Sequence, residues 1–159
     1  MKMFDLLQAL ADKNLKLGAV ESLTGGLFGA EVCAIPGASA VYKGGIVSYS
    51  AEIKESLVGV KPSTIQTYGV VSSQVAAEMA MGGAKALNVD VCVSCTGNAG
   101  PSSEPGQAHV GQVYLAVYYQ DNVWSIPLDF EGERNEIRRK TVDAMVAFLG
   151  SIFVSQQNN

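Results

Sequence analysis

Three residues with side chains that could make and use a nucleophile occur within one short part of the sequence: Ser22, Tyr49 and Lys54. A serine hydroxyl becomes a good nucleophile when a base removes its proton. A lysine can be that base if burial or a nearby charge lowers the pKa of its ammonium group. Together the three have the pattern of a lysine-activated serine. The alternative is that Tyr49 is an aromatic residue at the edge of the core and Lys54 a solvated helix residue.

The serine lies in the run Ala-Val-Glu-Ser-Leu-Thr-Gly-Gly (19–26), where a β-leaning segment changes to a helix-compatible one. Thr24 is placed to cap the first helical turn, and Gly25 and Gly26 would let the backbone approach a ligand. The unpaired N–H groups of that turn would offer donors to an anion or a developing oxyanion. The alternative is that these polar residues only end a strand and cap a helix.

A second candidate for ligand binding is the glycine-rich loop that follows the apolar run 89–96. Long Gly/Pro/Ser loops after a central strand are often functional. The residues of this loop that we expect at a binding site are Thr96, Gly97, Asn98, Ala99 and Gly100.

Two arginines, Arg134 and Arg138, lie at the start of a predicted C-terminal helix. Cations at this end of a helix oppose the favourable dipole arrangement, so their presence needs a reason. An anionic ligand group such as a phosphate would supply one. The alternative is pairing with neighbouring glutamates, which we favour for Lys140.

The pattern of apolar residues predicts a three-layer α/β/α sandwich on a mixed β-sheet, with residues 1–159 as a single domain and a frayed polar tail from about residue 155. Ser50 and either Ser72 or Ser73 are expected helix caps. Gly82 and Gly83 lie inside a predicted helix, where close packing against a neighbour is the natural reason for them. Helices are predicted over 6–12, 27–35, 51–58, 74–87 and 133–153, with a helical turn from Pro62; strands are predicted over 15–20, 42–50, 89–96, 111–119 and 122–130, the last two as a hairpin.

Composition excludes several classes of protein. The chain has 159 residues, of which 48% are hydrophobic and 16% charged, which argues against disorder. The net charge of −4 and the lack of a Lys/Arg block disfavour nucleic-acid binding. Neither a signal peptide nor a run long enough to span a bilayer is found, so we expect a cytoplasmic protein without membrane contact. The oligomeric state stays open, and a homo-oligomer is compatible with the sequence.

The cysteines do not predict a metal site. Cys92 and Cys95 have Cys-x-x-Cys spacing, but they lie in a predicted strand whose alternation would send their sulfurs to opposite faces. No second Cys/His pair is available, and the single histidine, His109, is in a predicted loop. We therefore expect these two and Cys33 to be buried, reduced thiols.

Four motifs, in this order and spacing over nearly the whole chain, resemble the carboxy-terminal domain family of CinA. They are Val-Glu-Ser-Leu-Thr-Gly-Gly (20–26), Gly-Gly-Ile-Val-Ser-Tyr-Ser (44–50) with Lys54, Thr-Gly-Asn-Ala-Gly-Pro (96–101), and Gly-Glu-Arg (132–134) with Arg138. Asn98 departs from the apolar residue that is common in the family loop, and Leu23 stands where a cysteine is frequent. Asn98 could alter the pocket wall.

Stand-alone members of this family resemble amidohydrolases that convert nicotinamide mononucleotide to nicotinate mononucleotide and ammonia, without a metal or cofactor. The resemblance implies that Ser22 is the nucleophile, Lys54 its general base, and Tyr49 a partner that orients the lysine or relays the proton. It also implies that Arg134 or Arg138 meets the substrate phosphate. The alternatives are a non-catalytic nucleotide-binding or regulatory module that serves a competence or damage response, and a purely structural assembly domain.

Overall fold

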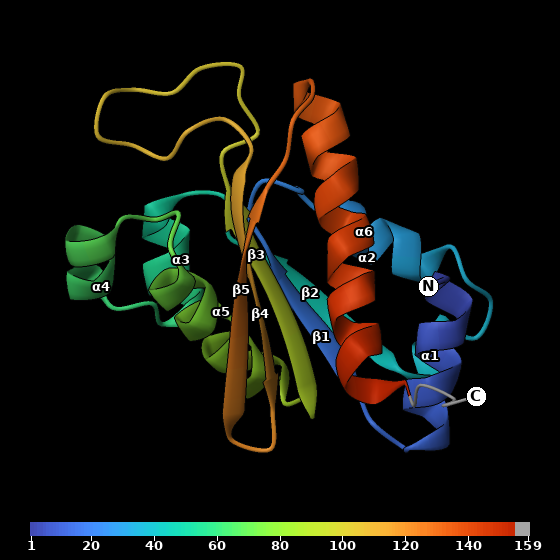
Figure 1. Ribbon diagram of the computed structural model, residues 1–159. Coiled ribbons are helices and arrows are strands. Elements are labelled where there is room, and N and C mark those ends of the chain that lie inside the picture. The colour runs from blue at the N-terminus through green and yellow to red at the C-terminus, as the bar shows by residue number, and fades with distance from the viewer. Residues whose placement is uncertain (155–159) are drawn as a thin grey trace.

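A computed structural model describes residues 1–154, so the polar tail expected from about residue 155 lies outside the described residues. The fold is the predicted α/β sandwich (Figure 1). Its helices are α1 (Met3–Asp12), α2 (Leu27–Cys33), α3 (Ala51–Val58), α4 (Pro62–Tyr68), α5 (Ser73–Leu87) and α6 (Arg134–Phe153), with a short 3-10 helix η1 (Ala38–Ala40). Its strands are β1 (Leu17–Glu21), β2 (Tyr42–Val47), β3 (Val91–Gly97), β4 (Gln112–Tyr119) and β5 (Asn122–Asp129).

The sheet is mixed, as predicted, with strand order β2-β1-β3-β4-β5. Strand β1 pairs in parallel with both β2 and β3, whereas β3–β4 and β4–β5 are antiparallel. The carboxyl ends of β1, β2 and β3 therefore lie at the same edge of the sheet, which is where open α/β sheets bind ligands.

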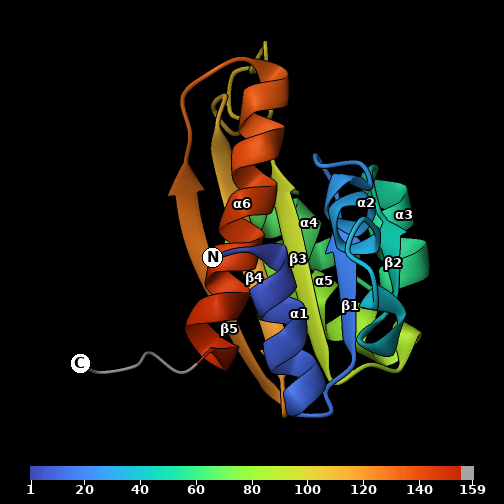
Figure 2. The same ribbon diagram turned by 90° about the vertical axis from the view of Figure 1, so that its right-hand side faces the viewer.

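The helices form one layer on each face of the sheet (Figures 1 and 2). Helices α1, α2 and α6 cover one face, and α3, α4 and α5 cover the other. The larger core lies under α6 and contains Phe28 and Leu149, both fully buried. A smaller core under α5 contains Met79. Helices α2, α5 and α6 pack directly against the sheet, whereas α1 packs on α6, and α3 and α4 pack on α5.

Several local predictions are confirmed. The side chains of Ser50 and Ser72 accept hydrogen bonds from Ile53 N and Val75 N, so they cap α3 and α5. Gly82 lies where a Cβ atom would come within 1.7 Å of the Val58 carbonyl oxygen, which explains a glycine inside a helix. The predicted strand 15–20 is displaced by one to two residues, because β1 continues to Glu21 in register with β2.

The cysteine predictions are only partly correct. Cys92 packs in the core under α5 and Cys95 in the core under α6, so their sulfurs lie on opposite faces of the sheet. All three cysteines are free thiols. Cys33, at the end of α2, is exposed rather than buried, because the short helix ends at this residue and turns it to solvent.

Candidate active site

Three polar segments meet at the edge where the parallel strands end. Ser22 directly follows β1, Ser48 and Tyr49 follow β2, and Gly97 ends β3. The register places Glu21 opposite Val47 in the neighbouring strand, so the first two segments leave the sheet side by side. The topology therefore brings together turns that are far apart in the sequence.

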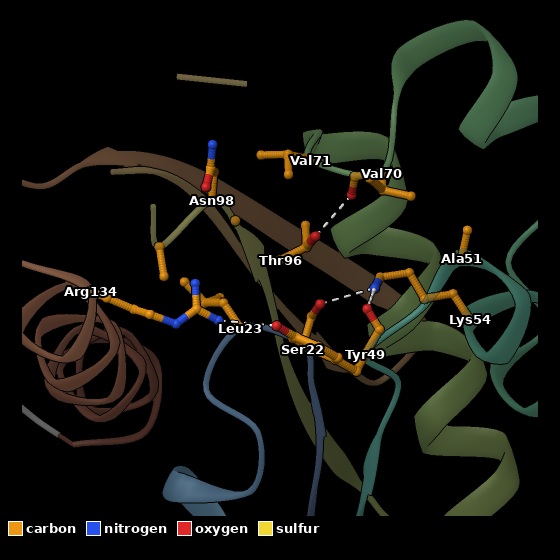
Figure 3. Close-up of a pocket in the computed structure, with 12 residues that line it drawn as sticks. Ser22, Leu23, Tyr49, Ala51, Lys54, Val70, Val71, Thr96, Asn98 and Arg134 are labelled. Atoms are coloured by element: carbon orange, nitrogen blue, oxygen red, sulfur yellow. Dashed lines mark hydrogen bonds between the residues drawn. The ribbon is translucent and has the colours of Figure 1, made fainter. Parts of the chain in front are cut away.

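Ser22 and Lys54 are in direct contact at this edge (Figure 3). The Lys54 Nζ atom lies 2.9 Å from Ser22 Oγ. It also donates to two backbone carbonyl oxygens, those of Ser48 at 2.7 Å and Tyr49 at 3.5 Å. The carbonyls only accept, whereas a hydroxyl can donate or accept. A neutral amine with two N–H groups on the carbonyls would thus direct its lone pair at the serine hydroxyl.

The side chain of Lys54 is buried, with 2% of its surface exposed. Burial lowers the pKa of Lys54 from 10.5 to about 8, because the charged ammonium loses its hydration; the Cys95 thiol opposes this shift. A substantial fraction of the residue is consequently neutral at mildly alkaline pH. The solvated-helix alternative for Lys54 is therefore wrong, and the residue is suited to accept a proton from Ser22.

The Tyr49 side chain points elsewhere. Its hydroxyl accepts a hydrogen bond from Arg134 Nη2 at 3.0 Å, and 63% of the residue is exposed. Only its backbone carbonyl contacts Lys54. The structure therefore brings Tyr49 into the site, but it places the phenol beside the arginine instead of the amine.

Arg134 is the first residue of α6, and its guanidinium extends into the site. Besides Tyr49, it donates to the carbonyl oxygen of Gly100. Figure 3 shows Arg134 and Lys54 on opposite sides of Ser22. Both acceptors of the guanidinium are neutral, and within residues 1–154 no carboxylate forms an ion pair with it. Its positive charge therefore remains available to an anion.

The turn after Ser22 differs from the sequence prediction. Thr24 does not cap α2: its hydroxyl lies 3.2 Å from the buried Cys95 sulfur, and the cap position is Gly26, in the left-handed region with φ 103°. The carboxylate of Glu21 instead accepts from Phe28 N and Gly29 N. These amide groups are thus already occupied by an acid, so the predicted anion site at the start of this helix is wrong.

Arg138 is one turn further along α6 and faces the same serine turn from behind. Its Nε donates to Leu23 O and its Nη2 to Thr24 O, both at 2.9 Å, while Nη1 donates to Asn135 Oδ1 at 3.0 Å. A planar guanidinium can hold two carbonyls in a fixed geometry. Arg138 thus joins α6 to the nucleophile turn and does not line the cavity.

Lys140 also differs from the prediction. Its ammonium donates to the Glu131 backbone carbonyl at 2.6 Å, and no glutamate carboxylate pairs with it within the described residues. Glu131 lies in the segment just before α6, so its carbonyl is within reach of a lysine on the second turn of that helix.

A cavity of about 290 Å³ opens beside Ser22. This volume is just below the range for small-molecule sites, about 300–1,000 Å³. Lys54 and Arg134 are its two cationic residues, and no carboxylate is among the described residues that line it. The lining consists of Ser22, Leu23, Tyr49, Ala51, Lys54, Val70, Val71, Thr96, Gly97, Asn98, Ala99 and Arg134.

Most of the predicted site residues line this cavity, but five do not. Thr24 is buried, and Gly25 and Gly26 belong to the turn between Ser22 and α2. Arg138 acts as a clamp on this turn, because its guanidinium donates to the carbonyls of Leu23 and Thr24. Gly100 contributes its carbonyl to Arg134. Val70 and Val71 also line the cavity, and they were not predicted because an apolar pair in a loop carries no chemical signal.

Asn98 and Thr96 use their polar groups to fix the cavity wall. The Asn98 amide accepts from Gly100 N at 2.8 Å and donates to Ser102 O and Ala108 O, so it folds the loop on itself. Thr96 donates to Val70 O at 2.8 Å. Asn98, which replaces the apolar residue common in the family, thus adds hydrogen bonds within the loop that forms this wall.

A second cavity of about 460 Å³ adjoins the first. The two share Val70, Val71, Gly97 and Asn98 as lining residues. Tyr68, at the end of α4, lines the second cavity but not the first. The site therefore has room beyond the compartment at Ser22.

The described part of the chain holds no cluster of three or more His, Cys, Asp or Glu residues able to bind a metal ion. His109 pairs with Asp129 at 3.0 Å on the surface, as a loop residue. None of the helices within residues 1–154 combines the length and apolarity that crossing a bilayer requires.

The CinA C-terminal domain model matches residues 3–153. A CinA-like protein from Thermotoga neapolitana is 40% identical over 147 residues, which cover 92% of this chain and 35% of that protein. The chain spans about a third of the length of the curated relatives it matches. A CinA superfamily protein from Escherichia coli is similar in structure, with a TM-score of 0.92, 27% identity and coverage of 94% of this chain and 87% of that one. A competence/damage inducible protein from Agrobacterium tumefaciens gives a TM-score of 0.87 at 31% identity, covering 96% of each chain.

Proposed function

Because the chain belongs to the CinA C-terminal domain family, we propose that its cavity hydrolyses the carboxamide of nicotinamide mononucleotide to nicotinate mononucleotide and ammonia. The observation that carries the proposal is the contact between the buried Lys54 amine and Ser22 Oγ. A serine paired with a lysine of lowered pKa is equipped for acyl transfer from an amide.

The reaction would run through an acyl-enzyme. Neutral Lys54 takes the Ser22 proton as Oγ attacks the carboxamide carbon, and the resulting ammonium returns that proton to the departing nitrogen, which leaves as ammonia. Water then attacks the ester with Lys54 again as base, and the Lys54 ammonium returns that proton to Ser22 Oγ as the bond to the acyl carbon breaks. The carboxylic acid so formed gives up its own proton, which the released ammonia takes up. The sum is amide plus water to carboxylate plus ammonium.

The charges around the cavity support an anionic substrate. Arg134 carries an unpaired positive charge on the far side of Ser22 from Lys54, and no carboxylate lies among the described lining residues to repel a phosphate. A mononucleotide carries its amide and its phosphate at opposite ends. It could therefore present the amide to Ser22 and the phosphate to Arg134 at the same time.

An ammonia-release assay with nicotinamide mononucleotide, its riboside and the full dinucleotide tests the proposal. We expect turnover of the mononucleotide, loss of turnover in Ser22→Ala, and no change in Ser39→Ala, which removes a hydroxyl from an exposed residue of η1. A Ser22→Ala protein that released ammonia at near wild-type rate would refute the acyl-enzyme and indicate direct attack by water. Saturable binding of the mononucleotide without ammonia release by the wild-type protein would support the regulatory module instead.

A further inference from the structure

The Tyr49 hydroxyl is one of two neutral groups that hold the Arg134 guanidinium at the cavity. Tyr49 belongs to the segment between β2 and α3, Arg134 begins α6, and Gly100 lies in the loop after β3. The guanidinium thus joins three separate segments through its bonds to the phenol oxygen and the Gly100 carbonyl. An arginine side chain has many rotamers, and two acceptors on different segments restrict it to one direction.

The same phenol has no route to the proton that catalysis would move. The contacts of Lys54 Nζ are Ser22 Oγ and the carbonyl oxygens of Ser48 and Tyr49, and these account for all its hydrogen bonds within the described residues. The hydroxyl of Tyr49 is bonded on the opposite side of Ser22, to Arg134. Removing it would therefore leave the serine–lysine pair with its contacts intact.

Because both of its acceptors are neutral, the positive charge of Arg134 is not compensated within the protein and can pair with an anionic ligand. Arg139, by contrast, pairs with the carboxylate of Glu31 at 2.9 Å, so its charge is neutralised within the protein. A guanidinium has five N–H donors, and the bonds of Arg134 to Tyr49 and Gly100 use two of them. The remaining donors can form charge-assisted bonds to phosphate oxygens.

We propose that Tyr49 is a positioning residue for substrate recognition, which holds Arg134 toward the substrate phosphate and takes no part in proton transfer between Ser22 and Lys54. The inference rests on the proposed amidohydrolase function for its substrate, and it assigns specificity for the phosphorylated over the dephosphorylated amide to the Tyr49–Arg134 pair. Arg134 is the group that touches the phosphate, and Tyr49 acts through it.

The test is Tyr49→Phe, which keeps the ring and removes the hydroxyl. We expect KM for nicotinamide mononucleotide to rise about two- to tenfold, the change that corresponds to ordering one rotamer-rich side chain, with kcat within about twofold of wild type. KM for the riboside should stay unchanged, and so should the basic limb of the pH profile of kcat. Tyr118→Phe is the matched control, because it removes a phenol that bonds to Asp121 in the β4–β5 hairpin.

The double variant separates positioning from a direct contact of the phenol with substrate. In an Arg134→Ala background, Tyr49→Phe should produce no further rise in KM, since the group it positions is already absent. Additive effects, or an equal fall of kcat for both substrates, or a lost basic limb, would overturn the inference while leaving the amidohydrolase function intact.

A wild-type protein without ammonia release would instead refute the function, and the inference would then be decided by calorimetry. The inference would be supported if Tyr49→Phe bound the mononucleotide more weakly than wild type, while Arg134→Ala and the double variant bound it equally. Equal mononucleotide affinity of wild type and Tyr49→Phe would overturn it.

Discussion

Replacing Lys54 with methionine should change the stability of the protein in a way that depends on pH. Methionine is close to lysine in length and has no charge to desolvate. The fall in the pKa of Lys54 from 10.5 to about 8 corresponds to a cost on the order of 3 kcal/mol for keeping the ammonium in the folded protein. The variant escapes this cost, but it leaves the Ser48 carbonyl and Ser22 Oγ without their partner, which opposes the gain by about 1–3 kcal/mol.

The pH dependence of the stability difference is the diagnostic quantity. Between pH 8 and 10.5 the unfolded chain holds more protons on Lys54 than the folded protein does, so raising the pH stabilises the wild type relative to the variant. The cost of the ammonium is fully present below about pH 8 and falls to about 1 kcal/mol at pH 10. The free energy of unfolding of Lys54→Met minus that of wild type should thus decline by about 2 kcal/mol from pH 7 to pH 10.

Urea unfolding at several pH values measures this difference, because other titrating groups act on both proteins alike and cancel. Lys85→Met is the control, since it removes an ammonium from an exposed position on α5. A stability difference for Lys54→Met that stayed constant from pH 7 to pH 10 would show that burial does not destabilise the ammonium. Lys54 would then not be suited to act as a neutral base.

Three further predictions concern the same elements. Lys54→Arg keeps a cation that does not deprotonate, so turnover should collapse while calorimetry still detects mononucleotide binding; turnover within about tenfold of wild type would exclude Lys54 as the base. In Arg138→Lys the ammonium cannot hold both carbonyls of the serine turn, so kcat should fall by up to about a hundredfold for the mononucleotide and the riboside alike. A loss confined to the mononucleotide would instead make Arg138 a phosphate ligand. Gly82→Ala forces a methyl group against the Val58 carbonyl, so urea unfolding should show a loss of about 1–3 kcal/mol, and an unchanged midpoint would show that α3 and α5 separate freely.

Much of the fold could be predicted because it depends on short-range patterns. Apolar periodicity identified the helices and strands, and Ser50 and Ser72 cap their helices through hydrogen bonds to residues three positions away. The serine turn meets the segment after β2 because both follow parallel strands, which end at one edge of the sheet. The contact of Ser22 with Lys54 was a hypothesis that the topology made reasonable.

The prediction was wrong where two chemically suitable groups competed. Both Thr24 and Glu21 can cap a helix, but only Glu21 does so, and the threonine hydroxyl lies 3.2 Å from the Cys95 sulfur, 71 residues away in sequence. Such a contact has no local signature. The contacts of Arg138 with the backbone carbonyls of Leu23 and Thr24 likewise join residues far apart in sequence, so sequence patterns could not reveal them.

The clamp of Arg138 on the serine turn has a consequence for the order in which the site forms during synthesis. Arg138 and Leu23 are separated by 115 residues, and Arg134 belongs to the same helix. A ribosome makes the N-terminal parts of a domain first, and contacts of such long range form late because the intervening chain must be in place. The serine, its lysine and the strands that carry them leave the ribosome before α6 exists. A nascent chain that has not reached α6 therefore carries the reactive pair without its support and without its anion-binding cation, and the site becomes complete only when this helix docks.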